Sequence, residues 1–324
     1  MAVTLGFEAL QGALGMNDAI DLLERAFAHE AAGRAYLSPK FVSNFDGGSM
    51  RMLFAADYEA GYCATKAYHT VRGAGARFLV SLYRLQDGEL LALLDGRTIT
   101  DMRTGAASGV IARKVTVAGP VTVGLIGSGH QARAQLECLA SAYQVERAAV
   151  YSPTAANREA FAREMSAKLG FPVEAVASAQ AAARGHPVVA AASSARGSEP
   201  VLRGEWLDRC RLLCAVGNTR AQFAEVDVRC FQDARLVVMD TPHALEEAGE
   251  LRQAVAAGAL PESKRATLGQ IVTGAVAPPA SGMVVFKSVG TALQDLALAA
   301  RYYELLGARM GVPTATDLAS AKSP

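Results

Sequence analysis

A short stretch at residues 120–140 holds the residue types best suited to chemistry in this sequence. It reads PVTVGLIGSGHQARAQLECLA, an apolar β-branched run, then a glycine turn, then a helical pattern. Gly127 permits a sharp turn, Gly129 lets the backbone approach a pyrophosphate, and Ala132 lets the helix pack closely on the strand. Free N–H groups at the helix start favour phosphate. This order predicts a dinucleotide-binding loop, whose residues are Gly127, Ser128, Gly129, His130, Gln131 and Ala132.

The end of the following predicted strand bears on which dinucleotide binds. Folds that prefer NAD usually place Asp or Glu there, to bind the ribose 2′-hydroxyl. Here the residues at 151–154 read YSPT and hold no carboxylate. The hydroxyls of Ser152 and Thr154, with the nearby Arg158, could instead hold a 2′-phosphate. The sequence therefore favours NADP(H), with NAD(H) as the alternative. Ser152 and Thr154 could also be no more than the end of a strand and the cap of the next helix.

A second candidate anion site lies at residues 100–108, TDMRTGAAS. We expect a helix to begin here, capped by Thr100 or Asp101, and to run to about Lys114. Arg103 would then lie in the first turn, where a cation is mildly unfavourable. Arg103, Thr104 and the free N–H groups could bind an anion, or Arg103 could be a surface residue paired with Asp101. The sequence leaves both readings open.

The elements that must position these residues differ between the two parts of the chain. In the first third, a helix over 16–33 is expected, capped by Asn17 and ended by Gly33. Short strands follow at 40–44, 50–55, 62–71, 77–85, 90–94 and 98–99. Asp-Gly pairs at 87–88 and 95–96 predict hairpin turns. This part is predicted to be a mostly antiparallel sheet with helices.

From residue 121 the pattern changes to alternating strands and helices. Strands are expected at 121–126, 148–152, 172–176, 187–192, 212–216 and 235–239, and helices at 155–169, at 178–184 and, over a longer range, at 286–306. This predicts an α/β protein with a Rossmann-type doubly wound parallel sheet and a smaller α+β domain for substrate binding and dimerisation. The expected domains are 1–118, completed by about 302–324, and 119–301, with residues 313–324 partly disordered.

Composition excludes several other classes of protein. The 324 residues are 51% hydrophobic and 19% charged, with a net charge of +1. That charge gives no reason to expect nucleic acid or a membrane surface as partner. No apolar run could span a bilayer, and the N-terminus lacks the features of a signal peptide. Five scattered cysteines without a CxxC pair indicate reduced thiols, a cytoplasmic protein and no metal site.

Seven segments share their order and spacing with a known family. They are Thr65-Lys66 and residues 95–107 (DGRTITDMRTGAA), 127–132 (GSGHQA), 200–206 (PVLRGEW), 215–217 (AVG), 225–227 (EVD) and 285–290 (VFKSVG). In these segments the chain resembles the ornithine cyclodeaminase/mu-crystallin family along nearly its whole length. The resemblance implies a nicotinamide dinucleotide, an amino or imino acid as substrate, and a homodimer paired through the sheet of the first domain.

The resemblance also implies roles for particular residues. Lys66 matches the family lysine beside the substrate carboxylate and the reacting carbon, and Arg103 matches the arginine that clamps this carboxylate. Lys40 stands where many members carry another carboxylate-binding arginine, and Arg51 is a second candidate for that task. Thr219 occupies the position at which cyclodeaminases carry an aspartate that engages the substrate amine.

Further matched positions are expected near the cofactor. Lys287 and Ser288 would contact it from a helix start, and Gly249 and Glu250 would border the nicotinamide, whereas Glu225 and Asp227 are interpreted as structural residues that cap the next helix. The remaining cofactor candidates are Thr104, Val216 and Gly217.

These observations support three hypotheses. The first is an NAD(P)H-dependent reductase or dehydrogenase that delivers hydride to the C=N of an α-imino acid, with Arg103 and Lys66 on the carboxylate. The second is an ornithine cyclodeaminase with a recycled NAD, for which the sequence offers no amine-binding acid at residue 219. The third is a dinucleotide-dependent binding protein without catalysis, as mu-crystallin is for a hormone.

Overall fold

The structure, a computed structural model, describes residues 2–194, 197 and 199–307. The described residues fall into two compact units, one within Met1–Arg103 and Thr291–Pro324 and the other within Thr104–Gly290. The division lies at 103/104 and 290/291, not at the expected 118/119 and about 301/302. The helix that follows residue 291 packs on the sheet of the first unit, and so belongs to that unit from its first residue. The predicted disorder at 313–324 lies outside the described residues.

The first unit is built on a seven-stranded sheet, ordered β1-β7-β6-β5-β4-β2, with β3 paired to β4. Every pair is antiparallel except β1 and β7, which confirms the predicted, mostly antiparallel sheet. The strands are β1 (Val3–Leu5), β2 (Ala35–Leu37), β3 (Phe41–Phe45), β4 (Gly48–Asp57), β5 (Tyr62–Val71), β6 (Gly75–Arg84) and β7 (Leu90–Asp95).

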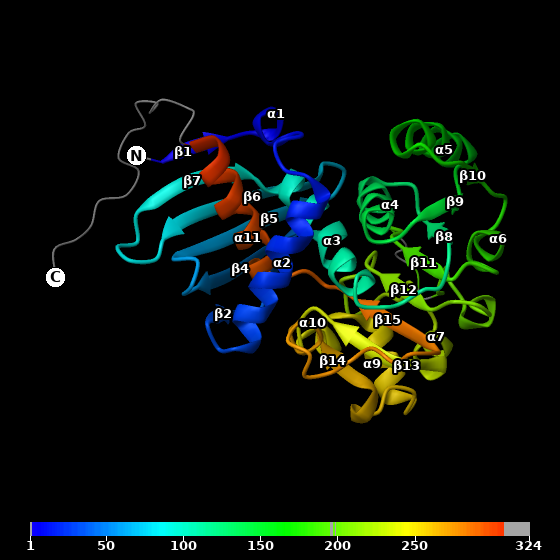
Figure 1. The fold of residues 1–324 in the computed structure, drawn as a ribbon. Coiled ribbons are helices and arrows are strands. Elements are labelled where there is room, and N and C mark those ends of the chain that lie inside the picture. Colours follow the sequence, from blue (N-terminus) through cyan, green and yellow to red (C-terminus); the bar gives the residue numbers. More distant parts are fainter. Residues whose placement is uncertain (1, 195–196, 198, 308–324) are drawn as a thin grey trace. The chain divides into compact units, whose positions relative to one another are not determined.

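Helices α2 (Met16–Ala31) and α11 (Ala292–Tyr302) lie over one face of this sheet (Figure 1). Beneath them, Ala55, Ala64, Val80 and Leu82 are fully buried. The first unit also holds α1 (Phe7–Leu10), the π-helical turn η3 (Tyr303–Gly307) and the start of α3 (Gly96–Ala112). The expected cap of α2 is wrong, because Gly15 precedes the helix and Asn17 lies inside it. Gly33, at φ +70°, follows the helix as expected.

The second unit is a parallel sheet of eight strands, ordered β10-β9-β8-β11-β12-β15-β13-β14. This confirms the predicted doubly wound α/β fold. The strands are β8 (Val121–Ile126), β9 (Val145–Tyr151), β10 (Val173–Ala175), β11 (Val188–Ala191), β12 (Leu212–Ala215), β13 (Ala234–Met239), β14 (Arg265–Thr267) and β15 (Met283–Lys287). The helices are α4 (His130–Ala142), α5 (Ala155–Leu169), α6 (Ala179–Ala183), α7 (Val228–Asp233), α8 (Ala244–Glu247), α9 (Gly249–Ala256), α10 (Leu268–Val272), and the 3-10 turns η1 (Gly204–Trp206) and η2 (Glu262–Lys264).

Two expected elements are wrong. Thr98 and Ile99 do not form a strand, because the carboxylate of Asp95 accepts the Thr98 N–H at 2.9 Å and starts α3 at Gly96. Arg103 therefore lies beyond the first turn of its helix, and neither Thr100 nor Asp101 caps it. The expected helix over 286–306 is also wrong at its start, because the strand β15 ends at Lys287 and α11 begins only at Ala292.

Candidate active site

Lys66 lies at the centre of a polar cluster buried in the first unit. It sits on β5, opposite Leu53 of β4 and Val80 of β6, and only 2% of it is exposed. Its ammonium Nζ donates to Thr100 Oγ1 of α3 at 2.6 Å and to Asp295 Oδ1 of α11 at 2.8 Å. The rings of Phe78 and Tyr68 lie 5.4 and 5.9 Å away. The buried lysine is thus held by hydrogen bonds from α3 and α11 and by the ring of Phe78 on β6.

Arg103 belongs to the same cluster. Its Nη1 donates to Gln294 Oε1 at 2.9 Å, and its Nε lies 3.4 Å from Asp295 Oδ1. The two cations predicted to bind a substrate carboxylate therefore meet at one aspartate. Asp295 Oδ2 and Arg103 Nε are buried and have no hydrogen-bond partner among the described residues. Counting Lys66 as ammonium, the trio of Lys66, Arg103 and Asp295 carries a net charge of +1.

The surroundings of Lys66 make its proton labile. The pKa of Lys66 is lowered from 10.5 to about 8, mainly by burial; the charges of Arg103 and Lys40 contribute to this lowering, and Asp295 opposes it. An amine that titrates near neutral pH can donate or accept a proton during a reaction. Lys66 is therefore suited to acid–base chemistry as well as to anion binding.

Of the other predicted substrate residues, Lys40 and Arg51 come from neighbouring strands. Lys40 lies just before β3 and is half-buried, near enough to affect Lys66. Arg51 is on β4, where its guanidinium lies 5.7 Å from the centre of the Tyr68 ring and donates to Ser49 Oγ at 3.3 Å. The structure thus gathers Lys40 and Arg51 around the Lys66 region.

Asp295, Gln294 and Thr100 were missed as site residues. The sequence does hold one signal for Asp295, because it is a carboxylate within a helix whose neighbours Leu293, Leu296 and Leu298 are buried. A charge on the buried face of a helix needs a partner, and Lys66 is that partner.

The glycine loop of the second unit has the geometry expected for a phosphate cradle. Gly127 adopts φ +114°, and a Cβ there would clash with the carbonyl oxygen of Ala192. A Cβ at Gly129 would instead meet no atom of the protein, so the protein alone does not require glycine there. The residue at the start of α4 is Gly129, which makes no side-chain capping bond. Arg133 Nη1 donates to the carbonyl oxygen of Ser128 at 2.7 Å and braces the loop.

The rest of the predicted loop follows the same geometry. Ala132 is fully buried, as close packing of the helix requires, whereas His130 is exposed and Gln131 is half-buried. Thr104 lies outside this loop on α3, where its carbonyl oxygen accepts from Gln135 Nε2 at 3.1 Å.

The end of β9 lies against this loop. Ser128 Oγ donates to Ser152 Oγ at 2.8 Å, and Arg158 Nη1 donates to the carbonyl oxygen of Ser152 at 3.0 Å. Thr154 is exposed and precedes α5 without a side-chain capping bond. Ser152 and Arg158 thus stabilise the turn after β9 through their hydrogen bonds. The hydroxyl of Thr154 does not cap α5.

Lys287 and Ser288 do not lie at a helix start as expected, since Lys287 ends β15. The Lys287 side chain is fully buried, with Nζ 2.7 Å from Glu250 Oε1 and donating to the carbonyl oxygen of Asn218 at 2.5 Å. Ser288 Oγ donates to Asp240 Oδ2 at 2.6 Å. Lys287 thus braces the loop that carries Thr219, and Thr219 itself is exposed.

A second carboxylate braces the same loop. Glu225 accepts the backbone N–H of Gly217 at 2.8 Å and that of Ser193 at 2.5 Å, and so joins the loops after β12 and β11. Glu225 therefore caps no helix. Asp227 does cap α7, by accepting the N–H of Cys230. Val216, beside Gly217, is buried.

Within the part of the chain that the structure describes, no group of three or more His, Cys, Asp or Glu could hold a metal ion. Likewise no described helix combines the length and hydropathy needed to cross a membrane. The cysteines are free, and burial raises the pKa of Cys138, Cys210, Cys214 and Cys230.

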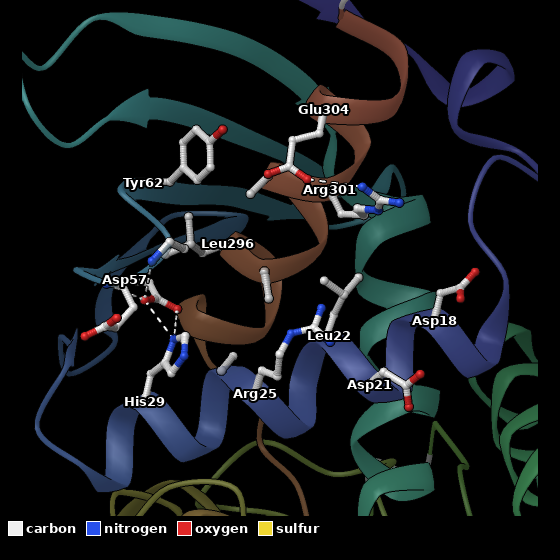
Figure 2. Close-up of a pocket in the computed structure, with 15 residues that line it drawn as sticks. Asp18, Asp21, Leu22, Arg25, His29, Asp57, Tyr62, Leu296, Arg301 and Glu304 are labelled. Carbon is white, nitrogen blue, oxygen red and sulfur yellow. Dashed lines mark hydrogen bonds and ion pairs between the residues drawn. The ribbon is translucent and has the colours of Figure 1, made fainter.

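A cavity of about 540 Å³ lies elsewhere in the first unit. Figure 2 shows the residues that line it. Its walls come from α2, α11 and the ends of β4 and β5. His29 Nδ1 lies 2.9 Å from Asp57 Oδ2, and Arg301 pairs with Glu304 at 3.3 Å. No predicted site residue lines this cavity.

Comparison with known proteins places this geometry in context. A sequence model of the ornithine cyclodeaminase/mu-crystallin family matches residues 3–309. A Delta(1)-pyrroline-2-carboxylate reductase of Bacillus cereus is 34% identical over 230 residues, or 70% of each chain. The structure of the Thermococcus litoralis enzyme of that name, in complex with NADH and L-proline, is 28% identical at a TM-score of 0.91, covering 98% of this chain and all of the other. An archaeal alanine dehydrogenase dimer with bound NAD is 25% identical at a TM-score of 0.87, covering 95% and 97%.

Proposed function

Because the chain belongs to the ornithine cyclodeaminase/mu-crystallin family, we propose that it is an NAD(P)H-dependent enzyme that reduces the C=N bond of an α-imino acid. The observation that carries this proposal is the buried trio of Lys66, Arg103 and Asp295. Two cations share one carboxylate, so the trio has one uncompensated positive charge. A buried charge needs a partner, and a substrate carboxylate supplies one.

The reduction needs a hydride at carbon and a proton at nitrogen. The Lys66 ammonium is the proton source in this proposal, since its pKa of about 8 keeps it charged at neutral pH yet able to release the proton. Arg103 holds the carboxylate, so that the reacting carbon has a fixed position. When bound, the reduced nicotinamide supplies the hydride.

The residues of the second unit fit a dinucleotide. Gly129 leaves space that a Cβ would take. The helix α4 begins directly after this glycine, and the positive dipole end of a helix favours phosphate. Ser152, Thr154 and Arg158 would hold a 2′-phosphate, and no carboxylate in the turn at 151–154 would repel it. We therefore favour NADP(H) over NAD(H). The solved relatives named above contain NADH or NAD, so the preference needs a direct measurement.

The test is oxidation of NADPH and of NADH by the purified protein. Substrates are five- and six-membered cyclic imino acids and pyruvate with amines, and L-ornithine runs in parallel with an assay for ammonia. Oxidation with an imino acid and silence with ornithine would support the reductase. Ammonia from ornithine would favour the cyclodeaminase and would require an acid in place of Thr219. Cofactor binding without any turnover would favour the binding protein.

We further propose that the protein is a homodimer paired through the sheet of the first unit. The support is one sheet face with six exposed large apolar side chains. They are Tyr36, Phe41, Phe45, Met52, Val71 and Leu79, each between 40% and 60% exposed. The strand register puts all six on the face opposite Lys66. An apolar patch of this kind marks an interface.

A further inference from the structure

We propose that Asp295 is a positioning residue, which holds Lys66 as an ammonium and aims Lys66 and Arg103 at one point before the substrate arrives. The proposal rests on the proposed reduction. Asp295 itself needs no contact with the substrate for this role.

The geometry of α11 supports the first step. Asp295 is 1% exposed, and its Oδ1 lies 2.8 Å from Lys66 Nζ and 3.4 Å from Arg103 Nε. The preceding residue, Gln294, accepts from Arg103 Nη1 at 2.9 Å. Two consecutive side chains of one buried helix thus fix two cations that come from β5 and α3.

The charges around Lys66 support the second step. The charges that act on Lys66 are those of Asp295 on α11, Arg103 on α3 and Lys40 before β3. Arg51 on β4 and Lys66 both lie near the ring of Tyr68, the titratable neighbour two residues along the strand of Lys66. Asp295 is the one carboxylate in this set. Burial and the cations favour neutral amine, and Asp295 opposes both. Without it, the trio would lose the charge that keeps the proton on Lys66.

The experiment replaces only the charge, with Asp295→Asn. We expect the basic limb of the kcat/KM profile to move to lower pH by about one unit, because an adjacent opposite charge raises a lysine pKa by at least that much. At pH 7.5 such a shift lowers the protonated fraction of Lys66 about threefold, so kcat/KM for the imino acid should fall at least about threefold, with KM for the cofactor unchanged. Asp295→Glu, which keeps the charge, should leave the limb in place while lowering kcat. Glu304→Gln, an exposed carboxylate on the adjoining η3 turn, is the matched control.

A second readout separates this proposal from the proposed function. NMR titration of ¹³Cε-labelled lysine, with the Lys66 signal assigned through Lys66→Arg, follows the Lys66 proton in the absence of any turnover. A downward shift of that titration in Asp295→Asn supports the positioning role even if no imino acid is reduced. An unmoved titration and an unmoved profile in a folded variant would overturn it. If Asp295→Asn does not fold, kcat of Asp295→Glu is compared with kcat of the native protein. A lower kcat with an unmoved basic limb supports the proposal, and an unchanged kcat contradicts it.

Discussion

At the scale of single residues, Lys66 is held where a charged amine is costly. Its Nζ is enclosed by two aromatic rings, by Thr100 and by Asp295, and Arg103 Nε lies 3.4 Å from the same carboxylate oxygen, Asp295 Oδ1. Such an arrangement is built before any ligand arrives, so little reorganisation is needed when the substrate binds. The burial that weakens the hold of Lys66 on its proton also makes it useful as an acid.

We predict that Lys66→Met abolishes reduction and spares the dinucleotide. Loss of a general acid typically costs 10²–10⁴-fold in rate, so kcat should fall by about 100-fold or more. The glycine loop is untouched, so the dissociation constant for NADPH, measured by fluorescence, should stay the same. Lys168→Met is the control, because Lys168 is 55% exposed and pairs with Glu137. Normal turnover in Lys66→Met would remove Lys66 from the mechanism.

The pH dependence of the native protein is a separate prediction. Burial lowers the pKa of Lys66 from 10.5 to about 8, so its proton is lost well below the usual range for lysine. If Lys66 acts as the acid, activity requires the protonated form. We therefore expect kcat/KM to be highest below pH 8 and to fall as the pH rises through about 8. A profile that rises through the same range would identify Lys66 as a base instead.

Residue-level prediction from the sequence reached part of this site. Lys66 and Arg103 came from resemblance, and they meet at one carboxylate. The sequence does not identify Asp295 as a site residue. Residues 286–306 are interpreted as one connecting helix, and Asp295 lies 229 positions from its partner Lys66 in the chain. Pairing over such a distance depends on the fold, which neither spacing nor periodicity reports.

At the scale of elements, Gly127 and Gly129 of the loop between β8 and α4 are needed for different reasons. Gly127 adopts φ +114° and has no room for a Cβ, whereas Gly129 has φ −84° and open space around its Cβ position. We predict that Gly127→Ala destabilises the fold by about 1–3 kcal/mol. Gly129→Ala should leave stability unchanged and weaken NADPH binding. Urea denaturation and fluorescence titration measure the two effects, and equal affinity in Gly129→Ala and the native protein would contradict the phosphate role.

The buried pair Lys287–Glu250 supports another element, the loop after β12. Replacing one partner of a buried pair leaves the other charge uncompensated, which typically costs about 3–5 kcal/mol. We expect that loss of unfolding free energy for Lys287→Met, and a partial recovery for the double variant Lys287→Met/Glu250→Gln. Arg229→Gln breaks an exposed pair with Asp233 and should cost about 0–1 kcal/mol. Equal losses for both single variants would argue against a structural role of Lys287.

Element types were predictable where the periodicity was unambiguous. The strands at 62–71 and 121–126 and the helix at 155–169 match their predicted bounds. The strand β15 was not predicted, because a short, continuous apolar run such as Val284-Val285-Phe286 fits a fully buried strand and a helix equally well. Its place between β12 and β13 is set by the sheet, not by its own sequence.

At the scale of the whole molecule, the residues of the proposed reaction are divided between two units. The first holds the cationic cluster, and the second holds the glycine loop. The sheet of the first unit has one face under α2 and α11 and another with exposed apolar side chains. A sheet with an open apolar face is an association risk unless a partner covers it. A second copy of the chain would present the same face, so the contact would be self-complementary and closed.

This argument predicts that a charge on the open face separates the copies. Leu79 is 45% exposed and shares this face with Met52, which lies opposite the same Ala67. Because the side chain is already half outside the protomer, Leu79→Glu should fold, yet burying its carboxylate in an apolar interface costs several kcal/mol. We expect the native protein to sediment as a dimer and Leu79→Glu as a monomer in analytical ultracentrifugation. Val255→Glu introduces the same charge at a 41% exposed apolar residue of the second unit, and should remain a dimer. A native monomer would contradict the proposed dimer. A dimer that persists in Leu79→Glu and dissociates in Val255→Glu would place the interface on the second unit instead of on this sheet.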